Sequence, residues 1–156
     1  MPTLPLLANL TPATADTHAD APRRVLAPGG YEWWHFEAFD PRADVRIVVI
    51  LFDGNPFHPG YLRRYQWYRR LPTRVHPPVP RDFPCVFVRV YEKDVLVAGT
   101  TWQHDPGACN PTTRGVRIGA DGFTRLDDGT LRLTVGRSLD LTFRPRGARP
   151  AAEARP

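Results

Sequence analysis

Proline and glycine are spread along the whole sequence and limit what it can fold into. The chain has 18 prolines and 12 glycines among its 156 residues. Proline breaks the interior of a helix and glycine weakens it, so this density disfavours a helical bundle. It suits short strands joined by turns. With 42% hydrophobic and 24% charged residues the composition is that of a globular protein, and the length fits one domain.

Apolar runs between these turns predict about eight β-strands. They are expected at residues 31–39, 45–52, 85–92, 95–103, 113–118, 123–126, 130–135 and 139–143. The last two alternate apolar and polar residues, which is the pattern of a strand buried on one face. The stretch 61–70 fits either a short helix or a strand. The near-regular spacing predicts an all-β fold, an antiparallel barrel or sandwich.

The first two predicted strands are apolar on both faces. In 31–39 one face carries Trp34 and Phe36, and the other carries Trp33 together with His35. Strands of this kind need cover on both sides, whereas a small barrel has a single interior. We therefore expect a second domain, a second subunit or the N-terminal arm to cover the outer wall.

The ends of the chain differ in composition from its centre. Residues 1–28 are rich in Pro, Ala and Thr and are expected to form a flexible arm, and residues 144–156 a disordered basic tail. The domain then spans 29–143. There is no apolar run of the ~20 residues that a membrane span needs, and no secretory signal is recognised. Cys85 and Cys109 are too few for a disulfide scaffold, which favours a reducing compartment and a cytoplasmic protein.

Two segments carry a family resemblance. Residues 29–38 read GGYEWWHFEA and resemble GGYEWWYFDA, the signature that opens the carotenoid 1,2-hydratase (hydroxyneurosporene synthase) family and related lipocalin-like proteins. Residues 52–61 match the F-x-G-x-x-F-S-P-x-Y stretch that follows there, except at His58. The resemblance implies an antiparallel lipocalin-like β-barrel, here the first of two, and a hydrophobic, isoprenoid-like small molecule as ligand. The departures are His35 for the family's Tyr and Glu37 for its Asp.

Hydration of an isoprenoid double bond requires an acid, a base and aromatic rings near the cation. The candidate catalytic residues are Glu32, His35, Glu37 and Asp53. The candidate ligand-binding residues are all aromatic: Tyr31, Trp33, Trp34, Phe36, Phe57, Tyr61, Tyr65, Trp67 and Trp102. Each also has a structural interpretation, because the tryptophans fit a core or wall and Asp53 fits a turn. A non-catalytic binding module, half of a two-barrel assembly, therefore stays open beside a hydro-lyase or isomerase.

The net charge of +5 is unevenly distributed. Residues 54–80 contain five arginines and no acidic residue, and in 61–70 the arginines alternate with aromatics. This pattern suits an anionic membrane surface or single-stranded nucleic acid, the latter less favoured, or a solvated loop packed on the barrel. No phosphate-binding glycine loop and no metal-ligand spacing is present, so we expect no cofactor and no metal.

Overall fold

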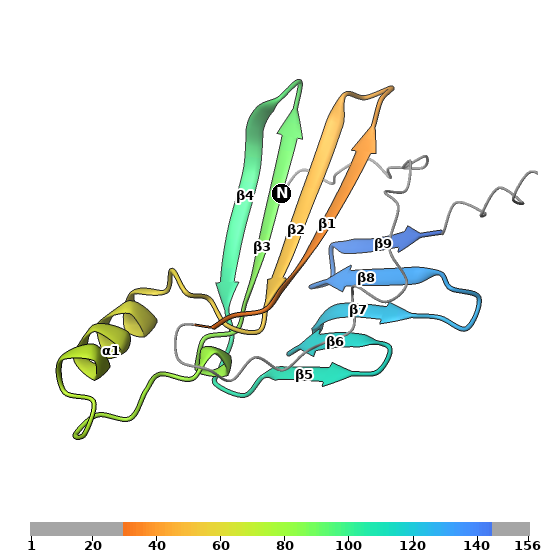
Figure 1. Cartoon of the computed structure of the whole chain (residues 1–156). Helices are drawn as coiled ribbons and strands as arrows, with labels where there is room; N and C mark the ends of the chain where they lie inside the picture. Colours follow the sequence, from red (N-terminus) through yellow and green to blue (C-terminus); the bar gives the residue numbers. More distant parts are fainter. Residues whose placement is uncertain (1–29, 145–156) are drawn as a thin grey trace, which may run out of the picture.

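The computed structural model describes residues 30–144 and arranges them as two antiparallel sheets with one α-helix (Figure 1). The first sheet has the order β1-β2-β3-β4, each strand pairing with the next along the chain. Its strands are β1 (Trp33–Asp40), β2 (Val45–Phe52), β3 (Cys85–Glu92) and β4 (Val95–Gln103). The predicted arm, 1–28, and all but the first residue of the predicted basic tail lie outside the described residues.

The second sheet is a meander as well, in the order β5-β6-β7-β8-β9. Its strands are β5 (Cys109–Thr112), β6 (Gly115–Ile118), β7 (Asp121–Arg125), β8 (Leu131–Val135) and β9 (Leu139–Phe143). In Figure 1 these strands run across the direction of the first sheet's strands. The all-β prediction is confirmed, with β5 as an additional strand.

The closed eight-stranded barrel is not formed by residues 30–144. β4 and β5 are edge strands of different sheets, and so are β1 and β9, so the described strands form two open sheets of four and five. The chain passes from one sheet to the other through a short irregular linker after β4. Closure depends on pairing between distant strands, and the alternation of apolar residues within one strand does not reveal it.

The hairpin between β3 and β4 shows how the local sequence sets the register. Lys93 and Asp94 both have positive φ, 51° and 61°, as a two-residue hairpin turn with the right twist requires. They do so without glycine, and the strands that they join have the predicted bounds. A bulge between Val90 and Tyr91 then shifts the register toward the end of the hairpin.

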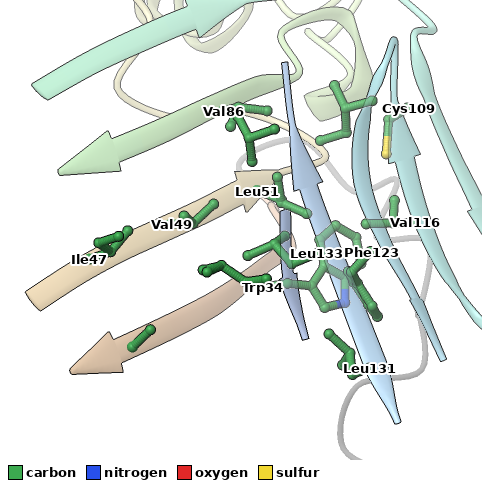
Figure 2. Packing of buried hydrophobic residues seen from close by; sticks show 14 of the residues in the cluster. Trp34, Ile47, Val49, Leu51, Val86, Cys109, Val116, Phe123, Leu131 and Leu133 are labelled. Carbon is green, nitrogen blue, oxygen red and sulfur yellow. The ribbon is translucent and has the colours of Figure 1, made fainter. Parts of the chain in front are cut away.

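The hydrophobic core lies between the two sheets (Figure 2). The first sheet contributes Trp34 and Leu51, and the second contributes Phe123 and Leu133, all of them at most 6% exposed. The ring of Trp34 lies 6.1 Å from that of Phe123, centroid to centroid. Because alternate residues of a strand face opposite sides, this core fixes which residues of β1 and β2 face outward.

The ambiguous stretch 61–70 is helical. Helix α1 (Pro59–Arg70) begins after His58, whose Nδ1 accepts a hydrogen bond from the Gly60 amide at 3.1 Å. Pro59 occupies the first turn, where its missing N–H costs nothing. A one-turn helix, η1 (Pro80–Asp82), precedes Phe83. The ring of Phe83 packs against Tyr61 of α1. Within residues 30–144 no helix has the length and apolar character to cross a membrane.

Candidate functional site

The outward face of the first sheet carries a group of aromatic rings at the start of β1. The aromatic cluster consists of Tyr31, Trp33, Phe52 and Phe87. Trp33 stacks on Phe52 with 6.0 Å between ring centroids and 16° between planes. Tyr31 and Phe87 approach Phe52 at 6.5 and 5.4 Å. Phe52 is therefore 6% exposed although it faces away from the core, while Trp33 is 50% and Tyr31 44% exposed.

Two of the predicted catalytic residues lie on the same outward face. His35 is exposed, with its ring 6.0 Å from that of Trp33. The Glu37 carboxylate lies 3.2 Å from Nε of Arg46, and both side chains are more than 40% exposed. The cover expected for this face is not supplied by residues 30–144. The catalytic roles of His35 and Glu37 stay predictions.

The other two predicted acids lie on the inner side, at the end of β1 and β2. The polar cluster is defined by Glu32, Asp53, Arg81 and Cys109. Asp53 is 2% exposed, and its amide donates to the Glu32 carbonyl at 3.0 Å. The Cys109 thiol hydrogen-bonds the Asp53 side chain. Cys85 lies outside this cluster, because it pairs with Phe52 and shares the outward face, and it hydrogen-bonds Asn55. Oδ1 of Asp53 has no hydrogen-bond partner within residues 30–144.

Both cysteines are fully buried, unpaired thiols whose surroundings keep them protonated. Burial raises the pKa of Cys85 to about 12, against a smaller lowering by the hydrogen bond with Asn55. Burial also raises the pKa of Cys109, and the Asp53 carboxylate adds to the rise. A thiol is a weak nucleophile and a poor metal ligand. Among the described residues no group of three or more His, Cys, Asp or Glu side chains is arranged to hold a metal ion.

The remaining predicted ligand-binding residues are divided among three places. Trp34 and Phe36 face the core, where Phe36 lies 5.1 Å from Phe123, centroid to centroid. Trp102 is on the edge strand β4 and is 42% exposed. The others lie on α1 or just before it: Phe57, Tyr61, Tyr65 and Trp67. The described residues do not bring the predicted site into one enclosed cavity.

Sequence reasoning missed four members of these groups: Phe52, Phe87, Arg81 and Cys109. Phe87 lies two strands away from Trp33 and joins the aromatic cluster through the pairing of β2 with β3. The polar cluster gains Arg81 and Cys109 from segments far along the chain. The alternation in β3 could have placed Phe87 outward, whereas nothing local could have placed Cys109. A shallow concavity lies elsewhere, on the outer face of β6–β8, and its lining includes Arg117, Arg132 and Thr124.

These features define an antiparallel β protein whose double tryptophan is divided between a core and an exposed aromatic cluster. The chain is partially homologous to carotenoid-modifying enzymes. It is 35% identical to hydroxyneurosporene dehydrogenase of Chlorobaculum tepidum over 79 residues, 51% of this chain and 20% of that protein. It is 32% identical to acyclic carotenoid 1,2-hydratase of Thiocapsa roseopersicina over 126 residues, 80% of this chain and 26% of that protein.

The chain thus spans about a quarter, or less, of the length of these curated relatives. No protein-family model matches the chain. No solved structure matches it.

Proposed function

We propose that this chain forms one wall of a binding site for an acyclic carotenoid or a similar isoprenoid. The observation that carries the proposal is the aromatic cluster, which exposes half of Trp33 on a face that the described residues leave uncovered. The partial homology to a carotenoid 1,2-hydratase supports the substrate class. A lipocalin-like barrel, completed by pairing beyond the two described sheets, would enclose such a ligand.

The cluster offers a flat apolar surface to a polyene. An aromatic side chain of this size buries roughly 150–250 Å² when it is covered, so the exposed half of Trp33 offers about 100 Å². At about 25 cal/mol per Å² this contributes up to about 2.5 kcal/mol, or about 70-fold in affinity. Rings already packed around Phe52, at 5.4–6.5 Å between centroids, lose little further freedom on binding.

The finer function that we propose is hydration of a terminal double bond, with the acids of the polar cluster as proton donors. A carboxyl proton moves to the less substituted carbon of the terminal double bond and leaves a tertiary cation on the other carbon of that bond. Water adds to the cation and returns a proton to the carboxylate, so the net change is the gain of one water. Glu32 and Asp53 suit this role because Asp53 is shielded from solvent and has one oxygen without a protein partner among residues 30–144.

The two surfaces meet at the end of β2. Phe52 belongs to the aromatic cluster, and the next residue, Asp53, belongs to the polar cluster on the opposite side. A long polyene lying on the aromatic cluster would bring one end to this edge of the sheet. In the proposed arrangement the rings hold the chain of the substrate and the carboxyl groups act on its terminus.

Binding is tested by gel filtration of the chain with an acyclic carotenoid in detergent, following the visible absorbance that elutes with the protein. Trp33→Ala is expected to weaken retention by tens of fold. The control is Leu126→Ala, which removes a side chain of similar exposure, 44%, beyond β7. Equal retention by both variants would contradict the proposed wall.

Chemistry is tested by mass spectrometry of the extracted carotenoid for the addition of one water. Glu32→Gln and Asp53→Asn should abolish turnover while the carotenoid stays bound. The matched control is Glu92→Gln, an exposed glutamate at the end of β3 that should retain turnover. Glu37→Gln and His35→Phe test the outward face, and loss of turnover in these two variants alone would place the proton donor there.

A non-catalytic module is the second candidate, favoured by the same exposed face. Half-exposed rings on a strand without cover fit a contact with a second lipocalin-like domain or a second copy of the chain. In that case Trp33→Ala would change the oligomeric state or domain association, and the carboxamide variants would change nothing. Sedimentation velocity of the wild type and Trp33→Ala separates the two functions.

A further inference from the structure

Helix α1 is set apart from both sheets. In Figure 1 it lies beside one end of the first sheet and covers neither face. Its inner side is held by Phe83, on which Tyr61 packs edge to face at 5.6 Å. Arg64 lies over the same ring at 5.5 Å and reaches Asp82 at 3.2 Å. The inner side of α1 is therefore occupied.

The outer side carries large apolar side chains and arginines together. The apolar members are more exposed than is usual for their type: Phe57 at 69%, Trp67 at 57%, Leu62 at 44% and Leu71 at 40%. Arg63, Arg69 and Arg70 are exposed between them, and no carboxylate of residues 30–144 pairs with these three. We call these seven residues the helix patch.

We propose that the helix patch docks on an anionic lipid surface. A short helix with arginines and a tryptophan on its free side lies in the plane of the interface, where the apolar side chains enter the headgroup region. The arginine stems extend along the apolar boundary and keep their charges among the phosphates. The positive charge of this segment complements an anionic surface. Residues 54–80 contain five arginines and no acidic side chain that an anionic surface would repel.

Docking would bring the chain to the lipid bilayer, in which a lipophilic substrate dissolves. In this respect, and in this alone, the inference rests on the proposed function. The lipid contact itself follows from the exposed side chains of α1 and stands if the carotenoid proposal fails.

A single-stranded nucleic acid fits the same patch less well. Base stacking requires several free ring faces along one groove. Tyr61 is 3% exposed and its ring is stacked on Tyr65 at 6.2 Å, so these two rings are engaged within the protein. The helix patch then has two free rings, Trp67 on α1 and Phe57 in the loop before it. The exposed leucines have no partner in a nucleic acid, whereas a bilayer accepts them.

The test is co-sedimentation of the whole chain with vesicles of phosphatidylcholine alone or mixed equally with phosphatidylglycerol. We expect binding to the mixed vesicles, with the tryptophan emission moving to shorter wavelength. Trp67→Ala should remove that emission shift. Arg69→Gln with Arg70→Gln should weaken partitioning by about 25-fold, since each basic residue near an anionic surface contributes roughly a factor of five. The control is Arg117→Gln, an exposed arginine of β6 on the second sheet.

Equal binding by all variants, or the absence of binding to mixed vesicles, would overturn the inference. So would a preference for a single-stranded oligonucleotide that competes the chain off the vesicles and persists in Trp67→Ala. Because these vesicles contain no carotenoid, the result is independent of carotenoid binding. The variant with Arg69→Gln and Arg70→Gln should keep the carotenoid retention that Trp33→Ala loses, which separates failure of one proposal from failure of the other.

Discussion

The two adjacent tryptophans of β1 should differ sharply in what they contribute to stability. Trp34 is 6% exposed and packs against Phe123 in the core, whereas Trp33 is 50% exposed on the outward face. Replacing each by alanine removes the same side chain at neighbouring positions of one strand. The comparison therefore isolates burial from local sequence and strand propensity.

The magnitude follows from the buried area. A covered tryptophan buries roughly 200 Å², worth about 5 kcal/mol at 25 cal/mol per Å², and truncation of core aromatics costs about 3–5 kcal/mol. Trp33 buries about half as much and leaves no closed cavity, so Trp33→Ala should cost about 1–2 kcal/mol. With a urea dependence of about 1–3 kcal/mol per M, the two midpoints should differ by about 1 M or more.

The assay is urea unfolding followed by far-ultraviolet circular dichroism. If Trp34→Ala does not fold, Trp34→Phe keeps a core ring and should still cost more than Trp33→Phe. Equal midpoints for the two positions, or a greater loss at Trp33, would refute the assignment of the faces of β1.

Three further predictions concern stability. Because burial holds the pKa of Cys85 at about 12 against an ordinary 9.0, this thiol ionises first in the unfolded chain. Its contribution is complete below pH 9 and is lost toward pH 12 at about 1.4 kcal/mol per pH unit, so Cys85→Ala should flatten urea-measured stability over that range. Gly122→Ala places a Cβ 2.2 Å from a backbone carbonyl oxygen, whereas the Cβ of Gly107→Ala meets nothing within 4 Å. Calorimetry should therefore show a loss of stability about 1–3 kcal/mol greater for Gly122→Ala than for Gly107→Ala. Asp121→Ala leaves the Gly136 amide and the His104 imidazole without their buried carboxylate, and should lower the free energy of unfolding by about 2–3 kcal/mol. Asp127→Ala removes only an exposed ion pair with Arg114 and should cost under about 1 kcal/mol in the same urea assay.

Much of the first sheet could be predicted from the sequence. The bounds of β2, β3 and β4 match the predicted strands, because β-branched runs end at sharp turns such as Lys93-Asp94. Alternation also placed Trp34 with Phe36 and Trp33 with His35 on opposite faces. Strand bounds and side-chain faces are local properties of the sequence. The structure keeps them because one face of each strand packs in the core.

Long-range features could not be predicted. β5 contains Asn110 and Pro111 and has no apolar pattern, yet it pairs with β6 as an edge strand. The helical start at His58 and Pro59 carries a capping signal, but the arginine and aromatic composition of 61–70 obscured it. Whether the sheets close into a barrel depends on pairing between strands that are distant in sequence. The alternation of apolar and polar residues along each strand is the same in a barrel and in open sheets, so it does not distinguish them.

The candidate site shows the same limit. Asp53 was recognised as a candidate acid next to a turn, and the structure adds its burial and its contact with Cys109. That contact joins the end of β2 to the first strand of the other sheet, across more than fifty residues of sequence. The sequence therefore identified the residue but not its surroundings.

The most direct test of the proposed wall uses tryptophan fluorescence in chains with a single tryptophan. The chain has four tryptophans, and replacing three by phenylalanine leaves either Trp33 or Trp67 as the reporter. A bound polyene accepts excitation energy from a nearby indole, so saturating acyclic carotenoid in detergent should quench Trp33 much more strongly than Trp67. Equal quenching of the two, or an unquenched Trp33 while the carotenoid stays bound to the protein, would contradict the account.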